Sequence, residues 1–295
     1  MAPYIGLPIW YNTLKKDYSI IEIKSVIQEL KSSGINLYEI SIDYPWSYKD
    51  FDLLYSLIDI LIENNIHIGI HAPWRDLFYA SPYEDLRKVA INILKTALNP
   101  IIGKYPIEYI VVHVTSMQKA GFENTYHDMV EAARKSIDEL FQWFNDYDIH
   151  LCIENVPKGF SSKPEDLVAI TGDNVYVALD IAHLYATYLR HFTNAYTNFN
   201  EFLEDSIVMI GSDKILAIHF HDVVFIGNRL FHHVIEHILP GMGILEYKNV
   251  LKKLSRTKAK YLLIEAFIDS KGRHLKLHQV ADGIREILTW LKIYL

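Results

Sequence analysis

The sequence predicts an α/β protein in which strand and helix units alternate to form one (β/α)8 TIM barrel. Short apolar runs alternate with longer amphipathic ones along the whole chain. The short runs are apolar on both faces, as expected of parallel strands covered by helices. The length of 295 residues is close to that of a typical barrel of this class.

Eight short apolar runs are predicted as the barrel strands. They cover residues 4–10, 37–43, 66–71, 109–114, 149–154, 175–180, 215–220 and 261–266. Amphipathic segments with helical periodicity lie between them, including residues 19–34, 52–65, 85–98, 128–146 and 278–294. The first of these ends at Gly34, a residue type that commonly terminates helices.

An open, doubly wound sheet is the alternative architecture. Such sheets usually have fewer strands and often a glycine-rich first turn, and the segment "IGLPIWYN" is not such a turn. The chain shows no linker, low-complexity segment or repeat beyond the strand–helix unit. We therefore expect one domain over residues 1–295.

Composition excludes several classes of protein. Half of the residues are hydrophobic and 20 are tyrosines, which excludes a disordered chain. No charge-free apolar stretch of about 18 residues predicts a membrane span, and the first residues lack the pattern of a signal peptide. The net charge of −7 without a basic block argues against non-specific binding of nucleic acid. The single cysteine, Cys152, is expected to be a buried, inert thiol in a cytoplasmic protein.

Ionisable residues stand at the ends of the predicted strands. These residues are His71, His113, Glu154, Asp180, His219, His221, Asp222 and Glu265, with His183 three positions after Asp180. A barrel brings the carboxyl ends of its strands together at one mouth, so these side chains are expected to converge.

Each of these residues alone has a structural explanation, such as a hydrogen-bonded histidine or a helix cap. Several buried carboxylates together are costly unless they are paired or bind a metal. Carboxylate oxygens and histidine nitrogens are ligands for divalent zinc, manganese, cobalt, iron or, with oxygen ligands, magnesium. The strand ends therefore predict a divalent metal site.

A second histidine-rich segment, residues 231–247, follows the seventh predicted strand. Pro240, Gly241 and Gly243 predict a tight loop there, shortly after His237. Taken alone, this pattern is also typical of histidines that face solvent. Its place between His219 and Glu265 in the chain makes it a candidate part of the site.

These motifs, in this order, resemble the xylose isomerase-like TIM barrel superfamily. The matching segments are "HAPWRDLFYAS", "VVHVTS", "CIENVP", "ALDIAHLYA", "IHFHD", "HILPGMGILEY" and "LIEAF", which together cover nearly the whole chain. The superfamily contains metal-dependent sugar and sugar-phosphate isomerases and epimerases, and also apurinic-site nucleases of the endonuclease IV type. The resemblance implies that the metal ligands are Glu154, Asp180, His219 and Glu265.

An isomerase or epimerase is the function that this resemblance favours. It implies that Glu154 and Glu265 exchange the substrate proton through an enediolate, and that His183 orients or protonates a substrate oxygen. Candidate substrate-binding residues are His71, His113, Trp74, His237 and Arg75, and Lys158 and Arg229 are further candidate binders of phosphate or hydroxyl groups. The expected partner is a small sugar or sugar phosphate, and barrels of this type often form homodimers.

The alternative function is that of an endonuclease IV-like zinc nuclease that acts at apurinic sites. Nucleic acid is an expected partner only under this alternative. In that branch the pocket histidines help to bind two further zinc ions, and a third metal site uses an Asp-x-His pair. Here the aspartate position is Ile235, with Glu236 or His233 as possible but differently spaced substitutes. A third possibility is a barrel that retains the site but functions as a lyase or as a binding protein, since a fold does not determine the reaction.

Overall fold

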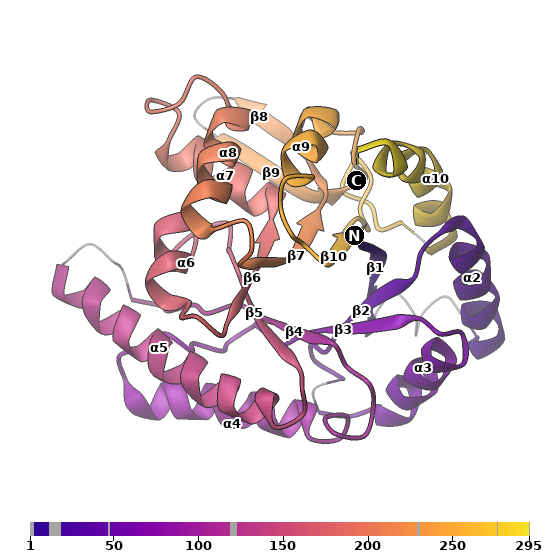
Figure 1. Ribbon diagram of the computed structural model, residues 1–295, viewed down its shortest axis with the longest axis horizontal. Coiled ribbons are helices and arrows are strands. Elements are labelled where there is room, and N and C mark those ends of the chain that lie inside the picture. Colours follow the sequence, from indigo (N-terminus) through magenta and orange to yellow (C-terminus); the bar gives the residue numbers. More distant parts are fainter. Residues whose placement is uncertain are drawn as a thin grey trace.

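Eight parallel strands close into a barrel, and helices surround it on the outside (Figure 1). The computed structural model describes residues 3–11, 19–46, 48–118, 123–228, 231–275 and 277–294. The strands follow one another around the barrel in the order β1-β10-β7-β6-β5-β4-β3-β2. They are β1 (Tyr4–Trp10), β2 (Leu37–Ser41), β3 (His67–His71), β4 (Tyr109–Val112), β5 (His150–Glu154), β6 (Tyr176–Asp180), β7 (Ile215–Phe220) and β10 (Tyr261–Ile264). Each of the eight predicted strands contains one of them, so the predicted (β/α)8 fold is confirmed.

Nine helices are described, and they pack against the outside of the barrel or against one another. They are α2 (Ile20–Ser33), α3 (Phe51–Glu63), α4 (Glu84–Leu98), α5 (Glu123–Asn145), α6 (Pro164–Ile170), α7 (Ile181–His191), α8 (Phe199–Ile210), α9 (Tyr247–Leu254) and α10 (Leu277–Tyr294). Within these described helices, none is long and apolar enough to cross a membrane.

Local sequence signals explain where α2 begins and ends. The Ser19 hydroxyl accepts a hydrogen bond from the Glu22 N–H, and the Glu22 carboxylate accepts one from the Ser19 N–H, which forms a capping box. The helix ends at Gly34, whose φ of 110° is readily adopted only by glycine. The predicted helix of residues 19–34 is therefore confirmed, with both end signals in place.

The barrel interior below the strand ends is filled by side chains. The Tyr109 and Tyr261 rings stack with centroids 4.3 Å apart. Gly69 makes room for Tyr109, because a Cβ atom at residue 69 would lie 2.4 Å from the Tyr109 ring. Cys152 is free and belongs to this buried cluster, as expected for an inert thiol. The polar residues of the interior lie above this packed layer, toward the carboxyl ends of the strands.

An antiparallel hairpin follows β7 and was not predicted. It consists of β8 (Asp222–Asn228) and β9 (Phe231–Ile238), which pair with each other and not with the barrel. The predicted loop of Pro240, Gly241 and Gly243 therefore follows β9 and not β7 directly. The Asp222 carboxylate accepts hydrogen bonds from the backbone N–H groups of Gly241, Gly243 and Leu245, which ties this loop to the start of β8.

Candidate metal centre

Strand periodicity explains why distant residues meet at the barrel mouth. Side chains alternate between the two faces of a strand, so residues two apart share the face toward the interior. Glu154 ends β5, Asp180 ends β6, His219 lies in β7, and Glu265 directly follows β10. Their ligand atoms all lie within 4.8 Å of one another, and all four side chains are buried. The structure thus brings together the four residues that were predicted as metal ligands.

The atoms at the centre of this cluster have the chemistry of a cation site. The Nδ1 atom of His219 lies 3.2 Å from Oε2 of Glu265 and 3.4 Å from Oε2 of Glu154. These three atoms are buried, and none has a hydrogen-bond partner within the described part of the chain. Buried polar atoms left without partners are costly. A divalent cation between them would be bound by all three, so the residues present fit such an ion.

Asp180 is held in place by several hydrogen bonds. Its backbone N–H and C=O both bond to the Asn155 side chain, at 2.8 and 2.9 Å, which joins the ends of β5 and β6. Its Oδ1 accepts a hydrogen bond of 2.7 Å from the His183 N–H and thereby caps α7. Its Oδ2 lies 2.9 Å from Nε2 of His221. The position of the carboxylate is therefore determined by three strand ends and one helix.

Glu39, in β2, also belongs to the site and was missed in the sequence. It is buried, and its Oε2 lies 3.2 Å from Nε2 of His219. A histidine that binds a metal through one nitrogen usually donates its other N–H to a carboxylate or carbonyl oxygen. Glu39 is placed to accept that proton and so to orient His219. The available signal was a glutamate between apolar neighbours in a predicted barrel strand.

A second group of ligand atoms adjoins the first and shares Glu154. It contains His71 at the end of β3, His113 just after β4, and Glu154. Oε2 of Glu154 lies 3.3 Å from Nε2 of His71 and 3.0 Å from Nε2 of His113. The Nδ1 atom of His71 lies 3.0 Å from the carbonyl oxygen of Ala72, so its Nε2 can accept, and this atom lies 3.2 Å from Nε2 of His113. Both histidines, which were predicted to bind substrate, therefore adjoin the candidate metal centre.

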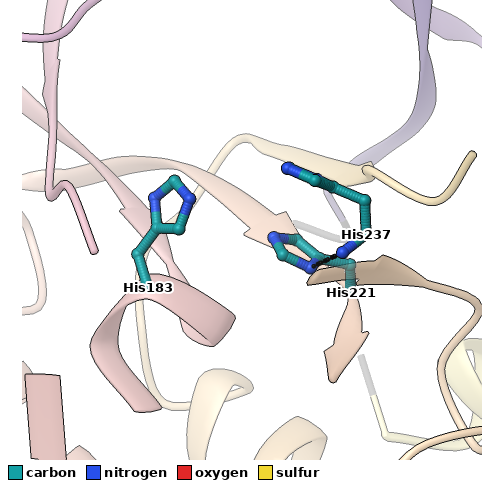
Figure 2. Close-up of side chains that lie close together, drawn as sticks. All are labelled: His183, His221 and His237. Carbon is teal, nitrogen blue, oxygen red and sulfur yellow. Dashed lines mark hydrogen bonds between the residues drawn. The ribbon is translucent and has the colours of Figure 1, made fainter. Parts of the chain in front are cut away.

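A third group contains three histidines, which Figure 2 shows side by side. The His221 and His237 rings stack with centroids 4.3 Å apart, and the His183 ring lies 6.0 and 6.2 Å from them. The β8–β9 hairpin brings His237 to this place, near the end of β9. His221 was noted in the sequence as a strand-end residue but was not predicted as part of the site. The sequence signal that could have identified His221 is its spacing of two residues from His219, since residues two apart in a strand face the same side.

The chain was compared with known proteins. A family described as xylose isomerase-like TIM barrel matches residues 26–294. This chain belongs to that family. MJ0008, an uncharacterized protein of Methanocaldococcus jannaschii, is 30% identical over 207 residues, which are 70% of this chain and 75% of that protein. A probable endonuclease 4 of Finegoldia magna is 24% identical over 217 residues, which are 70% of this chain and 72% of that protein.

Solved structures show the same fold at low sequence identity. A D-tagatose 3-epimerase-like protein superposes with a TM-score of 0.71 at 20% identity, over 99% of this chain and 98% of that one. A D-psicose 3-epimerase superposes with a TM-score of 0.65 at 16% identity, over 98% and 99% of the two chains. At this level of sequence identity, the similarity shows that these proteins share the barrel fold.

The carboxyl groups of this candidate centre have pKa values below their usual range. Burial alone would raise the pKa of Glu154, but the neighbouring His113 and His219 lower it well below its usual range. Burial also opposes ionisation of Asp180, yet His183 lowers the pKa of that carboxyl group. The ligand oxygens are therefore available to a cation without first losing a proton.

The pKa values of two pocket histidines, His183 and His237, are shifted in opposite directions. Burial alone would lower the pKa of His183, but the carboxylates of Asp180 and Glu154 raise it to about 10. Burial, together with the charge of His221, lowers the pKa of His237 to about 3. His237 is therefore a neutral imidazole across the physiological range, whereas His183 can hold a second proton.

The predicted substrate-binding residues outside these groups lie at different places. The Trp74 ring lies 5.5 Å from the His113 ring, measured between centroids, so it borders the centre. Arg75 pairs with Asp43 at 2.8 Å, and its guanidinium lies 4.4 Å from the centroid of the Trp74 ring. Lys158 is exposed, and Arg229 lies outside the described residues. Trp74 thus lies beside the site, and the predicted roles of Arg75 and Lys158 in substrate binding stay predictions.

Proposed function

We propose that this protein is a divalent-metal-dependent isomerase or epimerase that acts on a sugar or sugar phosphate through an enediolate. The observation that carries the proposal is the convergence of three buried atoms that have no hydrogen-bond partner among the described residues: Oε2 of Glu154, Nδ1 of His219 and Oε2 of Glu265. With Asp180 they form a set of four ligands at the barrel mouth, where enzymes of this fold have their active sites.

A bound divalent ion would act there as a Lewis acid, polarising adjacent substrate oxygens and acidifying the neighbouring C–H bond. Glu154 and Glu265 border the same point from β5 and from the end of β10. We propose that one carboxylate removes the proton and the other returns it, to the same carbon in an epimerase or to the adjacent carbon in an isomerase.

The surrounding residues have supporting roles in this proposal. The Nδ1 atom of His183 lies 2.9 Å from the carbonyl oxygen of Asn155, so His183 would donate to a substrate oxygen from Nε2. His71, His113 and His237 would bind substrate hydroxyl groups at the same mouth. Trp74 would cover the apolar face of the sugar.

The names of the structurally similar proteins suggest the first substrates to test. They include epimerases that act at carbon 3 of D-tagatose, D-psicose and L-ribulose. These sugars are ketoses, in which a carbonyl group neighbours a hydroxyl-bearing carbon, as an enediolate mechanism requires. A ketose is therefore the substrate class that we test first.

Phosphodiester hydrolysis is the second candidate, and one specific observation favours it. The His71–His113–Glu154 group shares Glu154 with the central group, and ligand groups that share a carboxylate are typical of two-metal hydrolases. The Finegoldia relative is named a probable endonuclease 4. The net charge of −7 and the isoleucine at position 235 argue against a duplex-binding nuclease.

Two assays on the purified protein decide between these functions. The first incubates the metal-loaded protein with D-tagatose, D-psicose and L-ribulose in D₂O and follows deuterium entry at carbon 3 by NMR. The second measures cleavage of a DNA duplex that carries an abasic-site analogue. We expect metal-dependent deuterium exchange and one tightly bound ion per chain. Cleavage of the duplex without exchange, together with three zinc ions per chain, would reverse the proposal.

A further inference from the structure

The geometry assigns to His221 the role of a positioning residue that holds Asp180 in place, and not that of a ligand for a separate ion in the three-histidine group. This inference rests on the proposed central metal site and adds a specific residue to it. His221 and Asp180 are both fully buried, and Nε2 of His221 lies 2.9 Å from Oδ2 of Asp180.

Both ring nitrogens of His221 are already engaged. The backbone N–H of His237 points at Nδ1 of His221, with a nitrogen–nitrogen distance of 2.8 Å (Figure 2). A backbone N–H can only donate, so Nδ1 must be the acceptor. The ring proton of neutral His221 is therefore on Nε2, where it is donated to Asp180.

The other two histidines of the group carry their protons differently. The Nδ1 atom of His183 faces the carbonyl oxygen of Asn155 at 2.9 Å, and Nδ1 of His237 faces that of Glu265 at 3.3 Å. Carbonyl oxygens accept, so both Nδ1 atoms carry a proton and Nε2 is the atom that each ring offers to a ligand. Nε2 has a lone pair in the neutral His237 ring, and in His183 once the second proton has left. This is the usual arrangement for a histidine that binds a metal or a substrate hydroxyl group.

A metal ion on Nε2 of His221 would displace the proton there. That proton would have to move to Nδ1, where the His237 N–H already occupies the lone pair. Two of the three nitrogen donors in the group are thus free, and the third is committed to Asp180. Ile235 supplies no ligand in its place, so the group lacks the three protein ligands that catalytic zinc sites use.

The contact also connects the β8–β9 hairpin to the metal centre. His237 has a φ of 63°, which is uncommon for a residue other than glycine. Its carbonyl oxygen accepts hydrogen bonds from the N–H groups of Phe267 and Ile268, both at 3.0 Å. These bonds hold the backbone on one side of residue 237, and on the other side its N–H is directed at His221. The hairpin thereby determines how His221, and through it Asp180, is oriented.

The test compares His221→Leu, which removes both hydrogen bonds, with His221→Gln, whose amide can still donate to Asp180. His127→Gln, an exposed substitution on α5, is the control. For each protein, equivalents of bound Co²⁺ are counted at saturation, and the Kd of the central ion is measured by competition with a chelator. Loss of an outer-shell partner typically weakens metal binding by about 10- to 100-fold.

We expect wild type and His221→Leu to bind the same number of ions, with the Kd of the central ion raised in the variant by about 10- to 100-fold and partly restored in His221→Gln. Loss of one whole equivalent from His221→Leu, with an unchanged central Kd, would show that His221 is a ligand and overturn the inference.

A measurement on the wild type is independent of whether His221→Leu folds. Long-range ¹H–¹⁵N NMR correlations of the His221 ring should show the Nε2–H tautomer both without metal and with Zn²⁺. A proton on Nδ1, with Nε2 shifted by the metal, would overturn the inference. If the wild type binds no ion, the proposed function fails, and the tautomer without metal still tests the His221–Asp180 contact.

Discussion

The Nε2 atom of His219 lies 3.2 Å from the Glu39 carboxylate, while its Nδ1 atom faces the carboxylates of Glu154 and Glu265. The proton of the His219 ring is therefore best placed on Nε2, where Glu39 accepts it. This leaves the Nδ1 lone pair directed at the proposed metal position. One histidine thus links a buried carboxylate of β2 to the proposed metal ligands at the ends of β5 and β10.

We expect Glu39→Gln to weaken binding of the central ion by about 10- to 100-fold, because the neutral amide holds the His219 ring less firmly. Competition with a chromogenic chelator measures this change. Glu63→Gln, an exposed substitution on α3, should leave the affinity unchanged. An unaltered Kd in Glu39→Gln would show that this carboxylate does not orient His219.

We expect Glu265→Gln to lower kcat by about 10²- to 10⁴-fold, the range that a positioned acid or base contributes. Metal retention should also fall, because the substitution removes the charge of a ligand. Circular dichroism should remain that of wild type, since the side chain lies at the barrel mouth. Full activity in this variant would contradict the assignment of Glu265 to the catalytic site.

We expect Trp74→Ala to raise KM for the sugar by about tenfold with a smaller change in kcat, since stacking on a sugar face contributes mainly to binding. Steady-state kinetics with the ketose that is turned over fastest separates the two constants. Tyr83→Ala, which removes an exposed aromatic side chain, is the control. A decrease in kcat with an unchanged KM would show that Trp74 takes part in the chemical step and does not cover the sugar face.

We expect Asp222→Ala to lower the free energy of unfolding by at least about 3 kcal/mol, because three backbone N–H groups of the Gly241–Leu245 loop lose their acceptor. Chemical denaturation measures this difference. Asp282→Ala, an exposed substitution on α10, should change stability by less than about 1 kcal/mol. Equal stability of the two variants would show that the loop does not depend on Asp222.

A fifth prediction concerns pH and the opposite end of the barrel. Burial alone would raise the pKa of Glu108, but hydrogen bonds from Tyr261, His67 and Lys260 lower it below its usual value. Because the folded-state pKa is the lower one, these contacts stabilise the fold fully above about pH 4.3, the pKa of a free glutamate. Their contribution is lost as the pH falls through the folded-state value.

Glu108→Gln should therefore lower the free energy of unfolding by about 1–3 kcal/mol at pH 7, and the difference from wild type should shrink toward pH 3. Urea denaturation at both pH values provides the measurement. A difference that is as large at pH 3 as at pH 7 would mean that the charge of Glu108 is not what stabilises the fold.

Periodicity and residue type were sufficient to predict the barrel. Each of its strands is a short apolar run, and α2 carries clear signals at both ends, Ser19 and Gly34. The β8–β9 hairpin was not predicted because its pairing is set by contacts outside the barrel sheet. Residues such as Val223 and Ile238 are apolar, but nothing in their spacing separates a hairpin from an irregular loop.

The central site was predictable because its residues end strands, and a barrel places all strand ends together. The resemblance to the family added which of these residues are expected to bind metal. Glu39 was missed because it lies inside a strand, where its role depends on the histidine that β7 places beside it. The sequence showed His221 at a strand end but gave it no role in the site. Its role depends on a hydrogen bond from the His237 N–H, and that bond depends on the backbone conformation of residue 237.

The donor atoms of the centre come from the ends of six different strands, β3 through β7 and β10. An ion bound there would join parts of the chain as distant as His71 and Glu265, and an unfolded chain could not offer this set of ligands. Occupancy and folding are then linked, and an ion present at 100 times its Kd adds about 2.7 kcal/mol to the stability of the whole barrel. The thermal unfolding temperature would thus report how much metal the protein holds, even before any substrate is known.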